Sequence, residues 1–319
     1  MLQDKKAIIT PYYQTDLGQA YLGDSLKLMK LIPDNSVNLV LTSPPFALTR
    51  QKEYGNKLEQ EYIDWFMQFS AEFYRIITPN GSVAIDLGGA YLPGHPVRSI
   101  YQYELLVRLC REQNFFLAQE FFHYNPARLP TPAEWVTVRR IRVKDSVNIV
   151  WWLSKTENPK SDNKQVLKPY SESMKSLLKK GYKAQLRPSG HDISEKFSTD
   201  NGGAIPPNLI ELANTESNSY YMKRCKELGL KPHPARFPKN FADFFIKFAT
   251  SEGDLVLDPF AGSNTTGYAA QLLNRKWLSF EISEAYLECS KIRFEEEPNL
   301  FNQQSKLNGK SKSQKERVA

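Results

Sequence analysis

The chain has 319 residues, of which 41% are hydrophobic, and its formal net charge is +7 at pH 7. A chain of this size can bury a substantial core, so we expect one large domain or one domain with a sizeable insertion. No apolar run approaches the ~18 residues that a membrane span needs, and residues 1–15 lack a signal-peptide pattern, which predicts a cytoplasmic protein with no membrane partner. The cysteines lie far apart without clustered histidines, so we expect neither a disulfide framework nor a metal site.

Short β-branched runs alternate with helical segments along the chain. The predicted strands span residues 37–41, 82–87, 254–258 and 276–282. Apolar residues at helical spacing predict helices at 62–78 and 241–250. This alternation predicts an α/β fold with a doubly wound, mainly parallel sheet.

Two segments differ in composition from the rest of the chain. Residues 155–232 are rich in Lys, Ser, Asn, Gly and Pro and contain few strand-like runs, which predicts a smaller inserted region. Residues 297–319 are polar and basic and predict a disordered tail. The main domain is therefore expected in residues 18–154 and 233–296.

The first predicted strand runs directly into Thr-Ser-Pro-Pro-Phe at residues 42–46. Two successive prolines fix two φ angles and remove two N–H donors, so the turn is stiff and its carbonyls are left as acceptors. Ser43 adds a hydroxyl that can accept a hydrogen bond from an amino group. Phe46 adds a flat ring that can stack on the base that carries this amino group. Taken alone, a proline-rich strand exit with a core phenylalanine is an equally good interpretation.

A second loop, DPFAGSNTTG at residues 258–267, lies between a predicted strand and a predicted helix. In doubly wound sheets, ligands bind at the carboxyl ends of strands, and small residues there let a ligand approach the backbone. Glu281 ends the next strand, where a carboxylate suits the hydroxyls of a ribose. A strand-to-helix turn rich in Gly, Ala and Ser is also common where close packing alone requires small residues. Because the chain lacks the GxxxxGK[ST] and GxGxxG patterns at this loop, an adenosine ligand without phosphates fits better than a triphosphate or a nicotinamide dinucleotide.

The two loops together resemble those of amino-methylating DNA methyltransferases that use S-adenosylmethionine, in the β-class order that places the catalytic motif before the cofactor motif. The SPPF form at residues 43–46 is typical of the cytosine-N4 members. The resemblance extends over most of residues 18–295. It is carried by GDSL (23–26), TSPPFAL (42–48), AIDLGGAY (84–91), YNPARLP (124–130), RPSGHDI (187–193), HPARFP (233–238), DPFAGSNTTG (258–267) and FEI (280–282).

This resemblance implies a circularly permuted methyltransferase fold with its catalytic half in residues 18–154, a target-recognition region in 155–232 and its cofactor-binding half in 233–296. The residues implied to bind S-adenosylmethionine are Asp24, Lys239, Asp258, Phe260, Ala261, Gly262, Ser263, Asn264, Thr265 and Glu281. Those implied to be catalytic are Ser43, Pro44, Pro45, Phe46 and Asp86. Many relatives carry a glycine where this chain has Asn264, but asparagine also adopts the left-handed conformation readily.

The implied reaction is methyl transfer to the N4 amino group of cytosine in double-stranded DNA, as in type II restriction-modification systems. Asp86 is the best candidate to accept the surplus proton, although a structural carboxylate at the Gly88-Gly89 turn is nearly as good an interpretation. The base must be flipped from the duplex, and Phe46 and Tyr124 are the candidate stacking residues. Trp151 and Trp152 are more often core residues in a run such as VNIVWWLS.

The implied partner is double-stranded DNA, held by basic residues around and within the inserted region. These candidates are Arg139, Arg140, Arg142, Lys144, Lys179, Lys180, Lys183 and Arg187. A cognate restriction endonuclease would share the DNA site without binding this chain, which is expected to be a monomer or a weak dimer. Two alternatives stay open at this point, namely adenine-N6 methylation and a catalytically silent DNA-binding protein on the same scaffold.

Overall fold

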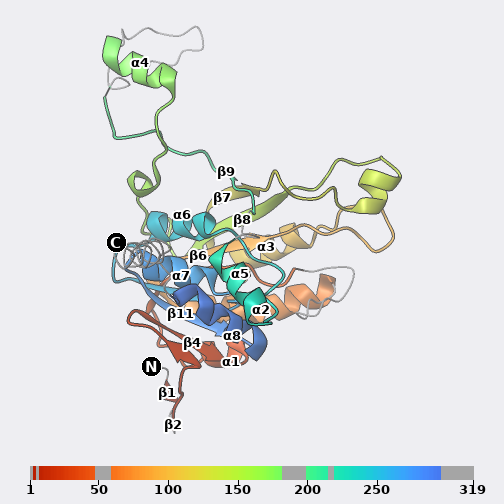
Figure 1. The fold of residues 1–319 in the computed structure, drawn as a ribbon, viewed down its shortest axis with the longest axis vertical. Helices are drawn as coiled ribbons and strands as arrows, with labels where there is room; N and C mark the ends of the chain where they lie inside the picture. The colour runs from red at the N-terminus through yellow and green to blue at the C-terminus, as the bar shows by residue number, and fades with distance from the viewer. Residues whose placement is uncertain (1–2, 5–6, 47–58, 182–198, 215–218, 296–319) are drawn as a thin grey trace, which may run out of the picture.

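A computed structural model describes residues 3–4, 7–46, 59–181, 199–214 and 219–295 of the chain. Its main feature is a sheet with the strand order β3-β4-β11-β10-β5-β6-β8-β7-β9. The strands of this sheet are β3 (Tyr13–Gln14), β4 (Gly18–Leu22), β5 (Val37–Thr42), β6 (Ile77–Leu87), β7 (Phe116–Tyr124), β8 (Val147–Ser154), β9 (Leu209–Glu211), β10 (Leu255–Asp258) and β11 (Lys276–Glu281). A separate pair, β1 (Gln3–Asp4) and β2 (Ala7–Ile8), lies near the N-terminus (Figure 1).

The central strands β4, β11, β10, β5 and β6 are parallel, whereas β8 is antiparallel to both β6 and β7. From β10 the chain crosses through a helix to β11 on one side, and from β5 it crosses to β6 on the other. The direction of winding therefore reverses between β10 and β5, which is where open α/β sheets bind their ligands. The doubly wound, mainly parallel sheet predicted from the sequence is confirmed.

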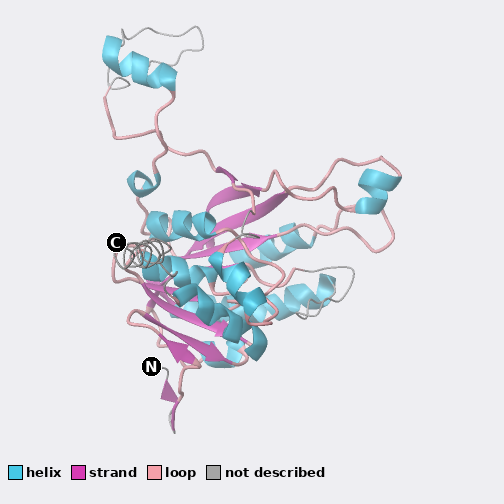
Figure 2. Cartoon of the chain, viewed as in Figure 1, coloured by secondary structure: helices cyan, strands magenta, loops and turns pink. Residues whose placement is uncertain are grey.

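Helices cover both faces of the sheet (Figure 2). They are α1 (Ser25–Met29), α2 (Glu59–Ile76), α3 (Tyr101–Arg111), α4 (Glu172–Lys180), α5 (Tyr220–Glu227), α6 (Lys239–Ala249), α7 (Thr265–Leu272) and α8 (Glu284–Lys291), with short helical turns η1 (Glu134–Val138), η2 (Asn163–Val166) and η5 (Ile292–Phe294). One core packs α1, α2 and α3 against the sheet, and the other packs α6 and α7 against the opposite face. Both faces of β5 are thus buried, which explains its mainly apolar sequence.

The helix expected at 62–78 begins instead at Glu59 and ends at Ile76, and β6 follows at once. The register of β6 on β5 shifts between Ile77 and Ser82. The Pro79-Asn80-Gly81 stretch, whose residues predict a turn between the helix and the strand, therefore lies in an irregularity of β6 instead. A proline cannot donate to a strand ladder, and such irregularities are where sheets accept it.

The segment 155–232 contributes both to the sheet and to a projection. Strand β9 pairs in parallel with β7 at the sheet edge, and α5 packs against α8 and η5 through Tyr221, Cys225 and Cys289. Helix α4, by contrast, stands well away from the sheet, and the loop that carries η1 forms a second projection (Figure 1). The predicted tail at 297–319, Lys183 and Arg187 lie outside the described residues. Within the part of the chain that the structure describes, no helix is long and apolar enough to cross a membrane.

Candidate active site

The two predicted loops lie side by side where β5 and β10 end. The Thr42 hydroxyl, at the end of β5, donates a 2.8 Å hydrogen bond to Asp258 Oδ1, at the end of β10. Asp258 Oδ2 accepts a 2.7 Å bond from Thr266 on α7. All three residues are buried, so this network fixes the predicted catalytic loop (42–46) to the predicted cofactor loop (258–267) in a water-excluded position.

A cavity of about 580 Å³ opens at this edge of the sheet, within the size range of small-molecule sites. Most of the residues predicted for catalysis and cofactor binding line it. They are Asp24, Ser43, Pro44, Pro45, Phe46, Asp86, Phe260, Ala261, Gly262, Ser263, Thr265 and Glu281. The topology thus brings together side chains that are up to 257 positions apart in the sequence.

Four predicted site residues lie outside the cavity wall. Asp258 lies beneath the loop, and Asn264 caps the N-terminus of α7, where its Oδ1 accepts from the Gly267 N–H at 3.0 Å. Lys239, the first residue of α6, pairs with Asp243 at 2.5 Å. Tyr124 ends β7, next to a histidine that does line the cavity.

The cofactor loop keeps its shape through two left-handed residues. Gly262 has a φ of 52°, and Asn264 has φ 51° and ψ 44°, so asparagine adopts the conformation expected of it here. The Gly262 N–H donates to Glu281 Oε2 at 2.8 Å, and the Ser283 N–H donates to Oε1 at 2.9 Å. A side chain at Gly262 would have its Cβ 3.1 Å from the His233 ring. Burial raises the pKa of Glu281, and its backbone donors oppose that shift.

Burial also raises the pKa of Asp258, from 3.8 to about 6, although two threonine hydroxyls and the Phe260 N–H donate to it. The folded state therefore holds this proton more tightly than the unfolded chain does. The contribution of Asp258 to stability is largest below pH 4 and falls as the pH rises to about 6.

We expect Asp258→Asn to remove this titration. Between pH 4.5 and 7.5, the wild type should lose on the order of 2 kcal/mol of unfolding free energy relative to the variant. Urea denaturation of both proteins across this range measures the difference. A constant difference at all pH values would contradict the raised pKa.

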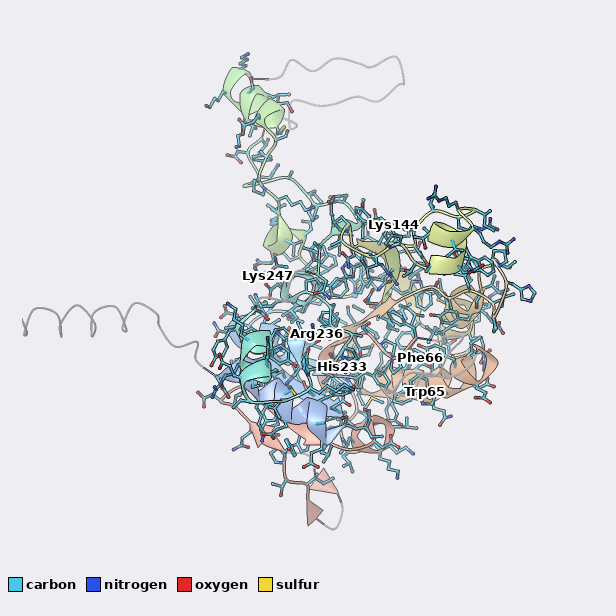
Figure 3. All side chains as sticks on the ribbon, turned by 45° about the vertical axis from the view of Figure 1, so that its right-hand side comes forward. Trp65, Phe66, Lys144, His233, Arg236 and Lys247 are labelled. Atoms are coloured by element: carbon cyan, nitrogen blue, oxygen red, sulfur yellow. The ribbon has the colours of Figure 1, made fainter. Side chains whose placement is uncertain are left out.

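An aromatic wall closes the cavity on the side of α2. Trp65 and Phe69 lie with their ring centroids 5.6 and 4.9 Å from that of Phe260. Trp65 on α2, and His233 and Arg236 on the segment before α6, approach the site from separate parts of the fold (Figure 3). The helical spacing of 62–78 placed Trp65 on a buried face but gave no sign that it would reach a ligand site.

The catalytic loop faces a polar cluster on β6 and β8. Ser43 Oγ donates to Asp86 Oδ2 at 3.3 Å, and Asn148 Nδ2 donates to the same oxygen at 3.2 Å. Arg128 in turn donates to Asn148 Oδ1 at 3.0 Å. The Phe46 ring packs on Gly88, where an added Cβ would lie 2.5 Å from it. Asp86 is therefore hydrogen-bonded to Ser43, the serine that the sequence predicts to be catalytic.

Sequence patterns gave no role to His123, Asn125, Arg128 and Asn148, which also line the cavity. Asn125 and Arg128 belong to the YNPARLP segment, so a motif pointed to their neighbourhood. His123 and Asn148 carry no such signal, because only the antiparallel register of β7 and β8 places them beside Asp86. Trp151, considered for base stacking, is fully buried in the core and lies away from the cavity lining.

Residues 37–292 match the family model described as DNA methylase, which is most of the chain. The chain belongs to the DNA methylase family. This methylase is 53% identical to the Type II methyltransferase M.PvuII of Proteus hauseri over 287 residues, which cover 89% of the chain and 85% of that relative. It is 27% identical to the Type II methyltransferase M.BamHI of Bacillus amyloliquefaciens over 293 residues, covering 89% and 59% respectively.

Solved structures agree with these sequence relatives. The PvuII DNA methyltransferase (cytosine-N4-specific) superposes on the methylase with a TM-score of 0.75 at 46% identity, over 91% of this chain and 90% of that one. The M1.HpyAVI complex with S-adenosylmethionine shares the fold, with a TM-score of 0.51 at 19% identity over 87% and 99%. The family resemblance and the methyltransferase fold expected from the motifs are confirmed.

Proposed function

We propose that the methylase transfers a methyl group from S-adenosylmethionine to the exocyclic N4 amino group of cytosine in double-stranded DNA. The observation that carries this proposal is the serine at position 43, which lines the cavity with Pro44 and Pro45 and is bonded to Asp86. Adenine-methylating relatives usually carry Asp or Asn at this position. The proposal is supported by the 53% identical relative and by the similar structure of the cytosine-N4-specific PvuII DNA methyltransferase.

The cavity residues fit S-adenosylmethionine. Glu281 is buried, its carboxyl group accepts hydrogen bonds from two backbone N–H groups, and it has lone pairs left for ribose hydroxyls. The Phe260 ring and the Ala261-Gly262-Ser263 turn offer an apolar face and a close backbone approach. We propose that Asp24, at the exposed N-terminus of α1, completes the adenosine end of the site. When bound, S-adenosylmethionine supplies an electrophilic methyl group.

The catalytic loop makes the amino nitrogen a better nucleophile. The lone pair of a cytosine amino group is delocalised into the ring. The Ser43 hydroxyl already donates to Asp86, so its lone pairs can accept from the amino group, together with the Pro44 carbonyl. These bonds favour tetrahedral nitrogen, and the rigid proline pair holds it in position for attack. No covalent intermediate with the enzyme is required.

We propose that Phe46 stacks on the flipped base, with Tyr124 near the opposite face of the base. We expect Phe46→Ala to lower the methylation rate between about 5-fold and 150-fold, since stacking on an aromatic side chain contributes about 1–3 kcal/mol per base. Binding of S-adenosylmethionine should be nearly unchanged in calorimetry. Phe46→Leu is the matched control because it keeps apolar volume on Gly88 without a flat ring. Wild-type turnover in Phe46→Ala would remove the ring from base stacking.

The two projections of Figure 1 are the surfaces that we assign to the DNA duplex. The η1 projection carries Arg139, Arg140, Arg142 and Lys144, and α4 carries Lys179 and Lys180 in its last turn. Basic groups of this kind bind phosphates and position the duplex. Since the proposed substrate is cellular DNA, we place the enzyme in the cytoplasm. We propose a monomer or weak dimer that shares its DNA site with a restriction endonuclease without binding it.

Expression in a host that lacks DNA methylation tests the proposal. Nucleoside mass spectrometry of the host DNA should detect N4-methylcytosine, and single-molecule sequencing should place it at one recognition site. N6-methyladenine would establish the adenine alternative. Absence of any modified base, with intact binding of S-adenosylmethionine, would favour a silent DNA-binding scaffold.

A further inference from the structure

Three polar side chains from three strands meet on one face of the sheet. The register pairs His123 on β7 with Asn148 on β8, and Asp86 on β6 with the residue two positions further along β8. Because alternate residues of a strand share a face, all three side chains point toward the same side. Phe241 of α6 covers that side, and its ring centroid lies 4.8 Å from that of His123. The sheet therefore holds His123 next to the proposed proton acceptor.

His123 is an exception among buried polar side chains. Only 8% of it is exposed, and neither ring nitrogen forms a hydrogen bond with any residue that the structure describes. Native proteins satisfy nearly all of their buried polar atoms, and each unsatisfied group calls for an explanation. A purely packing role on Phe241 would suit an apolar side chain better. The imidazole without hydrogen bonds lines the cavity, where the amino nitrogen must lose a proton during the proposed reaction.

The two oxygens of Asp86 have different surroundings. Oδ2 accepts from Ser43 and from Asn148, whereas Oδ1 has no hydrogen-bond partner among the described residues. Oδ1 lies 3.8 Å from His123 Nδ1, which is too long for a hydrogen bond and short enough for one to form by a small side-chain rotation. The buried carboxylate oxygen that lacks a hydrogen-bond partner is therefore the one that faces the imidazole.

We propose that His123 and Asp86 act as one proton-accepting pair during methyl transfer. As the amino nitrogen bonds to the methyl carbon, the sulfur–carbon bond breaks and the nitrogen must lose one proton. The Asp86 carboxylate takes up this proton, and a proton passes from the carboxyl group to Nδ1 of His123, which returns Asp86 to the carboxylate. His123 acts through Asp86 and is thus a positioning residue, which keeps Oδ1 aligned and holds the proton until it leaves to solvent.

The charged surroundings of the pair allow this transfer. Arg128 is separated from Asp86 by Asn148, which it contacts through Oδ1. Arg236, on the segment before α6, lines the same cavity and donates to the carbonyl of His233. Helix α6 itself presents the neutral ring of Phe241 to His123. Among the described ionisable side chains, Asp86 is the one paired with His123.

The inference rests on the proposed function, and single-turnover methylation across pH 5 to 9 tests it. We expect His123→Asn to react about 100-fold more slowly than the wild type, in the usual range for general acid–base catalysis, with KM values changed by less than about threefold. The pH dependence of the rate should differ between the wild type and the variant, because the imidazole that holds the transferred proton is absent from the variant.

His95→Gln is the matched control, since His95 is an exposed histidine outside the cavity, and it should keep the wild-type rate and pH profile. A wild-type rate in His123→Asn would overturn the inference. A slow variant with an unshifted pH profile would also overturn it, because that is the result of a purely structural role. If the wild type itself modifies no base, the proposed function fails instead.

A second measurement needs neither activity nor a folded His123 variant. In protein labelled with ¹³C at histidine Cε1, one histidine resonance should change its chemical shift in Asp86→Asn, because the carboxylate oxygen that lies 3.8 Å from His123 Nδ1 is replaced. The other histidine resonances should keep their chemical shifts. If no histidine resonance responds to Asp86→Asn, the two side chains are not a proton-sharing pair.

Discussion

Replacing Ser43 with alanine is expected to slow methyl transfer about 100-fold or more while leaving the affinity for S-adenosylmethionine close to that of the wild type. The hydroxyl lies at the end of β5, lines the cavity and donates to Asp86. Its removal takes away the acceptor that orients the amino group and the donor that fixes Asp86 Oδ2. Losing one such preorganised hydrogen bond typically costs a factor of about 100–1,000 in rate. Single-turnover assays with saturating DNA and calorimetry of cofactor binding measure the two quantities.

Ser36→Ala is the matched control for this variant. The Ser36 hydroxyl donates to the Pro33 carbonyl at an exposed turn before β5, and its loss should leave turnover unchanged. If Ser43→Ala keeps the wild-type rate, the serine does not orient the base. If it loses cofactor affinity to the same extent as turnover, its role is structural.

Glu281→Ala is expected to weaken the binding of S-adenosylmethionine by about 10-fold to 150-fold. A carboxylate that accepts from ribose hydroxyls contributes about 1.5–3 kcal/mol through charged hydrogen bonds. The same substitution leaves the buried N–H of Gly262 without its acceptor, so the cofactor loop is also expected to loosen. Calorimetric titration gives the affinity directly.

Glu281→Gln separates the two effects. Glutamine keeps one carbonyl oxygen for the Gly262 N–H, so this variant should fold like the wild type and bind S-adenosylmethionine with intermediate affinity. Equal affinities of the wild type and Glu281→Ala for S-adenosylmethionine would exclude the ribose role of Glu281. In that case neither its contact with the ribose nor its contact with the Gly262 N–H would contribute to binding.

Four strands of the sheet, β5, β6, β10 and β11, could be predicted because each has a local signal in the sequence. Strands β5 and β10 are buried on both faces, so their sequences are mainly apolar, and each leads into a loop with an uncommon residue pattern. The short edge strand β9 could not be predicted, because three residues with one buried side chain give no pattern. Its place in the sheet depends on pairing with β7, which is set by tertiary structure.

The same limit applies to the site. Ser43, Phe260 and Glu281 sit in motifs, and all three line the cavity. His123 and Asn148 come from ordinary strand sequences, and their meeting with Asp86 depends on the register of two antiparallel pairs. Trp65 belongs to a helix whose apolar face is visible in the sequence, but which of its aromatic rings borders a ligand depends on the angle at which the helix packs.

The hydrogen bond between Thr42 and Asp258 joins residues that are 216 positions apart. This hydrogen bond depends on the pairing of β5 with β10. It does not depend on which of the two strands comes first in the sequence. A gene in which the two halves exchange places would encode the same contact, provided that the new connection spans the sheet. The site therefore depends on which strands are adjacent in the sheet. Protein evolution can change the order of the segments that encode these strands and keep the same residues together in the site.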